Sequence, residues 1–358
     1  MNTIKGTKTI NIPLQNQRPR NRFLVWIGRS LLGLLVALIA LAVIGAVYQV
    51  IATVRDARAF PPPGQLVDVG GYNMHIVCTG PQNTGNPTVI LDHVGAANAA
   101  QWALVQPEIA KTTRVCAYDR AGFGWSESGP TPRDARQSMH ELHTLLGNAA
   151  IPAPYILVGH SYGGNVARLY VAEYPDEVTG MVLVDPGHPF DIPGVPPEIN
   201  AFWKTEDQTV MRLAPYLSRL GVMRLAVALG AVPGHGDLPE SDGAAYDAVN
   251  LTTKFWDALS DQNHAMAATS KEVLETPQSL GALPLIVLSA PLPVDEGRKM
   301  WTQVNAELAT RSSNSLHIVV DGATHMSFAL EHEQAQVTIA VILQVIEAVR
   351  TGQPLLSK

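Results

Sequence analysis

Short apolar runs that alternate with helix-like stretches constrain the fold of this chain more than any other feature of its sequence. The runs PTVILDHV, RVCAYDR, YILVGHS, GMVLVDP, LPLIVLSA and LHIVVDG each have the length of one buried strand and are bounded by turn residues. The earlier stretch LVDVGGYNMHIVCTG has the pattern of a hairpin, and stretches such as DARQSMHELHTLLGNAA have that of amphipathic helices. The alternation predicts an α/β fold with a mostly parallel sheet of about eight strands covered by helices.

The most specific local motif is the pentapeptide G-H-S-Y-G at residues 159–163. It follows the strand-like YILV and precedes the helix-like GNVARLYVAEYP. In this context Ser161 sits on a strained strand-to-helix turn, where small neighbours prevent clashes and the hydroxyl stays exposed above the sheet. The helix that follows directs backbone N–H groups at the oxygen. The motif therefore predicts a nucleophilic serine.

With this motif in a matching series of strands, the chain resembles the α/β-hydrolase superfamily over about residues 66–350. A serine hydroxyl needs a base to accept its proton at neutral pH. The resemblance places that base on the loop after the last strand, where His325 lies in VVDGATHMSF. The remaining candidates lie in an early strand, on an exposed helix or in a later insertion: His75, His140, His143 and His264.

The acid that would orient the imidazole has two candidates, and both fit the chain order serine, acid, histidine. Asp185 ends the strand-like GMVLVDP, which is similar to the acid position of haloalkane-dehalogenase-type relatives. Asp295, in LSAPLPVDEG, follows the next strand, the commoner position in the superfamily. It lies several residues past the strand end, behind two prolines and without the usual turn. The sequence favours Asp185 and leaves Asp295 open.

An oxyanion requires two backbone N–H donors, one of them from the residue after the nucleophile. Tyr162 occupies that position. The stretch ILDHVGAANAAQW resembles the family's His-Gly turn and suggests Gly95 as the second donor, although Val94 stands where a glycine is usual. His93 is interpreted as bracing this loop.

The segment YDRAGFGWS, residues 118–126, also resembles a recurrent superfamily segment. The chemistry requires neither of its charged residues, so Asp119 and Arg120 are interpreted as an ion pair that fixes a turn.

A stretch of about 19 uncharged residues, from Ser30 to Tyr48, has the length of a membrane-spanning helix. Arg29 and the basic residues before it predict a cytoplasmic N-terminus and an extracytoplasmic catalytic domain. A cleaved signal peptide is the alternative, but the stretch exceeds the usual apolar region and no clean A-x-A site follows it.

These features predict a chain in six parts. They are a cytoplasmic tail (1–29), a transmembrane anchor (30–50), a linker (51–64), an α/β-hydrolase core (65–186 and 284–350), a lid insertion (187–283) and a C-terminal tail (351–358).

Composition excludes several other classes of protein. The net charge is −6 with no basic cluster outside the N-terminal tail, so nucleic-acid binding has no electrostatic support. Two cysteines, Cys78 and Cys116, are too few for a four-cysteine metal site, and they form one bridge or two buried thiols. No metal and no organic cofactor is expected.

The insertion carries many apolar residues and few charges between residues 211 and 229, which fits a lid over a hydrophobic substrate. The sequence therefore predicts a serine hydrolase that cleaves a hydrophobic carboxylic ester through an acyl-enzyme. Thioester, amide or C–C bond hydrolysis and cofactor-free perhydrolysis use the same residues and stay open. A non-catalytic, membrane-tethered binding protein is the alternative from another class. The expected partners are the small-molecule ester and the lipid bilayer.

Overall fold

The structure is a computed structural model in which two compact units are distinguished, residues 1–44 and residues 45–358. It describes Gly6 and residues 22–82, 85–187, 208–231, 234–277, 279–291 and 296–355. Most of the expected cytoplasmic tail lies outside the described residues.

The first described element is the long helix α1 (Arg22–Ala59). Among the described residues it is the one helix long and apolar enough to cross a membrane, judged by length and composition over Val25–Ala59. The linker expected at 51–64 is partly wrong, because the helix continues through Ala59. Residues 51–59 contain neither glycine nor proline, so nothing in the chain stops the helix before the three prolines at 61–63.

The predicted sheet is confirmed, with eight strands in the order β1-β2-β4-β3-β5-β6-β7-β8. The strands β1 and β2 pair antiparallel, as do β2 and β4, and all other neighbours pair parallel. The strands are β1 (Gln65–Asp68), β2 (Asn73–Thr79), β3 (Thr88–Asp92), β4 (Val115–Tyr118), β5 (Tyr155–His160), β6 (Val178–Val184), β7 (Leu285–Ser289) and β8 (Ser315–Val319).

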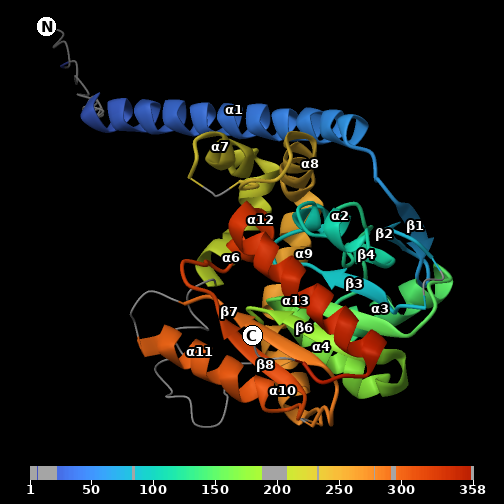
Figure 1. Ribbon diagram of the computed structural model, residues 1–358. Coiled ribbons are helices and arrows are strands. Elements are labelled where there is room, and N and C mark those ends of the chain that lie inside the picture. The colour runs from blue at the N-terminus through green and yellow to red at the C-terminus, as the bar shows by residue number, and fades with distance from the viewer. Residues whose placement is uncertain are drawn as a thin grey trace, which may run out of the picture. The chain divides into compact units, whose positions relative to one another are not determined.

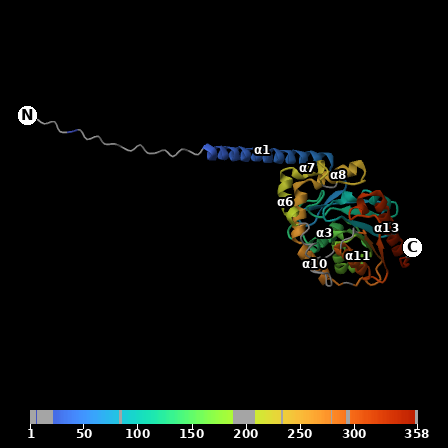
Figure 2. The same cartoon turned by 90° about the vertical axis from the view of Figure 1, so that its left-hand side faces the viewer.

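Helices cover both faces of the sheet, and Figure 2 shows α3 and α13 on opposite sides of it. Alternate residues of each central strand supply two separate cores: in β5, Leu157 packs with α3 and α4, whereas Ile156 and Val158 pack with α2 and α13. These helices and their neighbours are α2 (Gln106–Ile109), α3 (Ala135–Asn148), α4 (Tyr162–Glu173), α11 (Glu296–Ala309), α12 (Ser327–Leu330) and α13 (His332–Thr351). Strands covered on both faces explain the continuous apolar runs of the sequence.

Between β6 and β7 the described chain forms helices only, and in Figure 1 they run from α7 and α8 near the top of the view to α10 near the bottom. They are α6 (Gln208–Arg219), α7 (Val222–Ala228), α8 (Glu240–Asn250), α9 (Thr253–His264) and α10 (Met266–Glu275). The long apolar stretch at 210–230 is divided into α6 and α7 because Gly221 adopts a left-handed conformation with φ of 71°. Residues 188–207 of the expected insertion lie outside the described residues.

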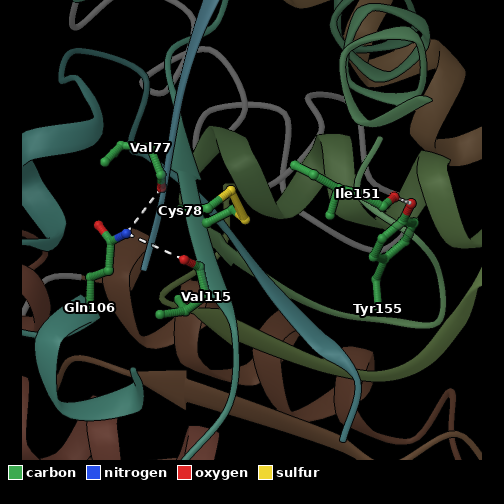
Figure 3. Close-up of a disulfide and its surroundings, with 7 residues drawn as sticks. Val77, Cys78, Gln106, Val115, Ile151 and Tyr155 are labelled. Carbon is green, nitrogen blue, oxygen red and sulfur yellow. Dashed lines mark hydrogen bonds between the residues drawn. A yellow bond between two sulfur atoms is a disulfide. The ribbon is translucent and has the colours of Figure 1, made fainter. Parts of the chain in front are cut away.

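Cys78 and Cys116 face each other in the β2–β4 pair and form a disulfide, so of the two alternatives the structure has the bridge. Figure 3 shows the bridge with Gln106 beside it; Gln106 Nε2 donates to the carbonyl oxygens of Val77 at 3.0 Å and Val115 at 3.4 Å. A covalent bond and a side-chain bridge thus hold the same two strands together.

Candidate active site

The predicted turn after β5 is present, and Ser161 lies on it with φ of 54°, a conformation that is strained for a residue with a side chain. The Ser161 N–H donates to the Val184 carbonyl at 3.0 Å, and its own carbonyl accepts from the amides of Gly164 and Gly187, both at 2.9 Å. A side chain at Gly159 would overlap the backbone of Gly163, which explains the small residues of the motif. Three backbone hydrogen bonds therefore hold the serine in its strained position.

Asp185 lies directly beside the serine, because His160 and Val184 are register partners and both strands end there. It also has a positive φ, 38°, and is 1% exposed. Its N–H donates to the Leu288 carbonyl at 2.9 Å, and its Oδ1 accepts from the Ala290 amide at 3.3 Å. The carboxylate is therefore fixed by the neighbouring strand β7 and its end.

His325 follows β8, as expected, and its Nδ1 lies 2.6 Å from Asp185 Oδ2. The ring is about one-third exposed, with a side-chain exposure of 35%, while the carboxylate is buried. An Asp185 carboxylate at Nδ1 fixes the tautomer that leaves Nε2 free to accept a proton. Within the described residues, no hydrogen bond joins Ser161 Oγ to this ring, a contact that often tightens only when substrate binds.

His160, the residue before the serine, connects two loops of the site. Its Nε2 donates to the His325 carbonyl oxygen at 2.7 Å, and its Nδ1 accepts from Gln101 Nε2 at 3.1 Å. Gln101 Oε1 in turn accepts from the Val94 amide at 3.2 Å. Burial, together with the nearby His325, lowers the pKa of His160 to about 3, so its imidazole is neutral at pH 7.

This chain of hydrogen bonds, which we call the His160 bridge, links the loop at Val94 to the loop at His325. Its members are Val94, Gln101, His160 and His325. Sequence reasoning missed Gln101, because its position depends on how the loop after β3 folds back over β5. His160 stands at the variable position before the serine of the motif, and no role was predicted for it.

Gly95 and Tyr162, the two residues expected to form an oxyanion hole, lie near each other. A Cβ at Gly95 would lie 3.7 Å from Tyr162 Cβ and 3.0 Å from Gln262 Nε2. His93 is fully buried, its Nδ1 lies 2.7 Å from the Val94 carbonyl, and burial and Arg120 hold its pKa well below the ordinary value. A neutral, buried His93 fits the bracing role expected for it.

The expected ion pair between Asp119 and Arg120 is wrong, because each charge is paired elsewhere. Arg120 Nη1 pairs with Asp92 and donates to the His93 carbonyl at 2.7 Å. Asp119 instead lies 2.8 Å from His75 Nδ1 and accepts from the Trp125 amide at 3.0 Å. Adjacent residues of a strand end point in opposite directions, so they brace two different loops.

The alternative acid and the surroundings of His325 complete the description of the site. Asp295 lies outside the described residues. Trp301 of α11 lies edge-on to His325, with ring centroids 6.5 Å apart. In the part of the chain that the structure describes, no group of three histidine, cysteine, aspartate or glutamate side chains could hold a metal ion. The arrangement at the sheet edge therefore offers a hydroxyl, an imidazole and a buried carboxylate.

Comparison with protein families agrees with this fold. Residues 87–219 match the family model described as the alpha/beta hydrolase fold. A putative lipase from Acinetobacter baumannii is similar in structure, with a TM-score of 0.58, 19% identity, and coverage of 86% of this chain and 97% of the lipase. The order of strands, the turn after β5 and these matches identify the fold of this chain as the α/β-hydrolase fold.

Individual relatives are more distant. An uncharacterized protein of Schizosaccharomyces pombe is 24% identical over 297 residues, which are 75% of this chain and 53% of that protein. The (lyso)-N-acylphosphatidylethanolamine lipase of Bos taurus is 25% identical over 295 residues, 76% of this chain and 83% of the lipase. The chain spans about half or less of the length of the first curated relatives it matches. At this identity the similarity supports a hydrolase and does not define the substrate.

Proposed function

We propose that the protein is a membrane-anchored serine hydrolase that cleaves a hydrophobic carboxylic ester. The observation that carries the proposal is the contact of 2.6 Å between His325 Nδ1 and the buried Asp185 carboxylate, beside a serine on a strained turn. A buried carboxylate that holds a partly exposed imidazole next to a strained serine is the arrangement that orients and charges the ring during acyl transfer.

In the proposed reaction, Ser161 Oγ attacks the ester carbonyl while His325 Nε2 accepts its proton. Asp185 stabilises the imidazolium, and the amides of Tyr162 and Gly95 stabilise the oxyanion of the tetrahedral intermediate. His325 then returns the proton to the leaving alcohol. Water attacks the acyl-enzyme by the same route in reverse, which releases the acid and restores the hydroxyl. No step requires a metal or an organic cofactor.

The nature of the substrate is proposed from the surroundings of the site. Two of the similar proteins are named as lipases: the (lyso)-N-acylphosphatidylethanolamine lipase of Bos taurus and the putative lipase from Acinetobacter baumannii. The helices α6, α7 and α9 contribute Ala214, Met223, Phe255 and Leu259 to a small apolar cluster that also contains Phe123. The helices α6 to α9 are the proposed lid. An ester with a long acyl chain fits an apolar lid better than a small polar ester does.

The membrane topology is part of the proposal. The basic residues before α1 favour an N-terminus in the cytoplasm and a hydrolase domain outside it. The disulfide between Cys78 and Cys116 supports this, because such bridges persist in oxidising compartments. A reporter fused to the C-terminus should be active only outside the cytoplasm, and a purely cytoplasmic signal would overturn the topology.

A fluorophosphonate probe applied to membranes with the full-length protein tests the catalytic proposal. The wild type should be labelled and Ser161→Ala should not. Ser241→Ala, an exposed serine at the start of α8, is the matched control and should be labelled like the wild type. A folded wild type without labelling would instead favour a binding protein on a hydrolase scaffold. A series of p-nitrophenyl esters of increasing chain length would then identify the preferred acyl group.

A further inference from the structure

The last turns of α1 are part of the hydrolase unit and pack against the helices that follow β6. Residues from 45 onward belong to the same compact unit as the sheet. A side chain at Gly45 would overlap the Leu220 carbonyl, and a Cβ at Gly221 would lie 3.2 Å from both the Gly45 carbonyl oxygen and the Tyr48 ring. The helix and the α6–α7 turn are therefore in backbone contact.

A set of polar side chains fixes this contact, and we call it the Gln49 cluster: Gln49, Thr53, Asp56, Arg224 and the Leu251 carbonyl. Gln49 is 2% exposed, donates to the Leu251 carbonyl at 2.8 Å and accepts from Arg224 Nε at 3.0 Å. Arg224 Nη1 also lies 2.6 Å from Asp56 Oδ2. Both the amide and the guanidinium are therefore satisfied by protein.

The position of the Gln49 cluster along α1 sets its depth relative to a bilayer. Twenty uncharged residues counted from Ser30 end at Gln49, and about 20 helical residues cross the hydrocarbon core. Gln49 would thus lie at the outer boundary of the core, where water is scarce and an unpaired amide is unfavourable. Gly45, one turn earlier, would lie within the acyl chains, and so would the Leu220 backbone that touches it.

Exposed apolar side chains concentrate around this level. Beyond α1, nine large apolar side chains are exposed among the described residues, and six of them lie between residues 213 and 229. They are Leu213, Tyr216, Leu220, Val222, Leu225 and Leu229. The outer turns of α1 add Val47, Tyr48, Val50, Ile51 and Val54, also exposed. Such a concentration marks an interaction surface and is not expected of a face in water.

We propose that this surface, the apolar side chains of α6–α7 together with those of α1 from residue 47 to 54, embeds in the outer leaflet of the membrane that α1 spans. The inference rests on the membrane anchoring proposed above. The bilayer is the occupant because α6–α7 packs at Gly45 against α1, a helix that is long and apolar enough to cross a membrane. Tyr216 has the amphipathic ring that is favoured at the headgroup level.

The embedded surface has a consequence for the substrate. Because α6 and α7 belong to the proposed lid, the entrance to the site would open beside the acyl chains and not toward bulk water. A lipid ester would then enter the site from the leaflet without first leaving the bilayer for water. The Gln49 cluster would hold the lid at that depth, so α1 would position the site as well as tether it.

The test uses the full-length protein in phosphatidylcholine nanodiscs and single cysteine variants labelled with bimane. The native cysteines are bridged and none is free among the described residues, so the introduced thiol is the one that reacts. The variants Leu225→Cys and Leu229→Cys lie on the proposed surface, at positions 58% and 74% exposed. The matched control is Leu274→Cys, an exposed leucine of α10, and Val36→Cys reports on the anchor.

Lipids with a doxyl group on the upper acyl chain should quench bimane at residues 225 and 229 and leave residue 274 at background. If residue 36 is quenched but residues 225 and 229 match the control, the embedded surface is wrong and the anchor stands. If residue 36 is not quenched either, the proposed anchoring itself is wrong. Fluorophosphonate labelling of each variant verifies that it is folded.

Discussion

The carboxyl edge of the sheet and the helices between β6 and β7 differ in which side chains they bury and which they expose. At the sheet edge, charged and polar side chains are buried and bound to one another, as in the Asp185–His325 contact and the His160 bridge. In α6 and α7, large apolar side chains are exposed and the buried charge of Arg224 is turned toward α1. The edge holds its polar groups in fixed positions, whereas α6–α7 leaves apolar side chains open to the partner proposed above.

The two regions also differ in what their stability depends on. The edge is fixed by strand register and backbone hydrogen bonds that exist whatever surrounds the molecule. The exposed side chains of α6–α7 gain free energy only where something removes them from water. Changes at the edge should therefore alter chemistry or folding, and changes in α6–α7 should alter how the protein meets a membrane. The predictions below test that division.

The largest expected effect is at Asp185. Asp185→Asn keeps the shape but removes the charge that stabilises the imidazolium, so kcat should fall by about 10⁴-fold with little change in KM. Asp295→Asn is the matched control and should lose little activity. The reverse result, a large loss in Asp295→Asn alone, would transfer the acid to the loop after β7. Steady-state kinetics on a soluble p-nitrophenyl ester measure both.

The second prediction concerns how the free energy of unfolding depends on pH through His160. The unfolded chain protonates His160 below about pH 6.5, whereas in the folded protein its pKa is lowered to about 3. This contribution to the free energy of unfolding is intact above pH 6.5 and is lost as pH falls toward 3, at about 1.4 kcal/mol per pH unit. His160→Gln cannot titrate and should unfold less steeply with acid. Urea denaturation between pH 7 and pH 4 measures the slopes, and parallel slopes would contradict the prediction.

The third prediction concerns the β2–β4 pair at the far side of the sheet. Replacing both Cys78 and Cys116 by alanine opens a covalent loop and should lower the free energy of unfolding by about 2–4 kcal/mol. The site lies on other strands, so fluorophosphonate labelling below the unfolding transition should be unchanged. Reduction of the wild type with dithiothreitol should give the same loss, and a double variant as stable as the oxidised wild type would be a contrary result.

Much of the sheet edge could be predicted because it depends on local patterns. Apolar runs identify the strands, and a residue that directly follows a strand must lie at the carboxyl edge of a parallel sheet, as Ser161 and Asp185 do. The contacts of Gln101 and Arg120 could not be predicted, since each depends on how a loop folds over a neighbouring strand.

The helices after β6 were predicted in kind but not in detail. Composition shows an apolar insertion, yet it does not reveal that Gly221 divides it or that Gln49 and Arg224, 175 residues apart, are hydrogen-bonded. Contacts between helices so far apart in the chain leave no periodic pattern in the sequence, so the sequence does not indicate them. The extent of α1 was misjudged for a related reason, because Thr53 and Asp56 of its last turns contact Arg224, far along the chain.

The smallest expected effect is at Leu225. An exposed leucine contributes little to folding, so Leu225→Ser should change the free energy of unfolding in detergent by no more than about 0.5 kcal/mol. kcat on a soluble ester should stay the same, because the edge of the sheet is untouched. On a lipid ester presented in vesicles, kcat/KM should fall by about three- to tenfold, as expected when part of a buried apolar side chain is lost from a membrane contact.

Leu274→Ser, the control on α10, should leave both activities unchanged. Equal losses on soluble and vesicle substrates would show that Leu225 acts through the site itself. The claim that α6–α7 affects membrane contact and not chemistry would then be wrong.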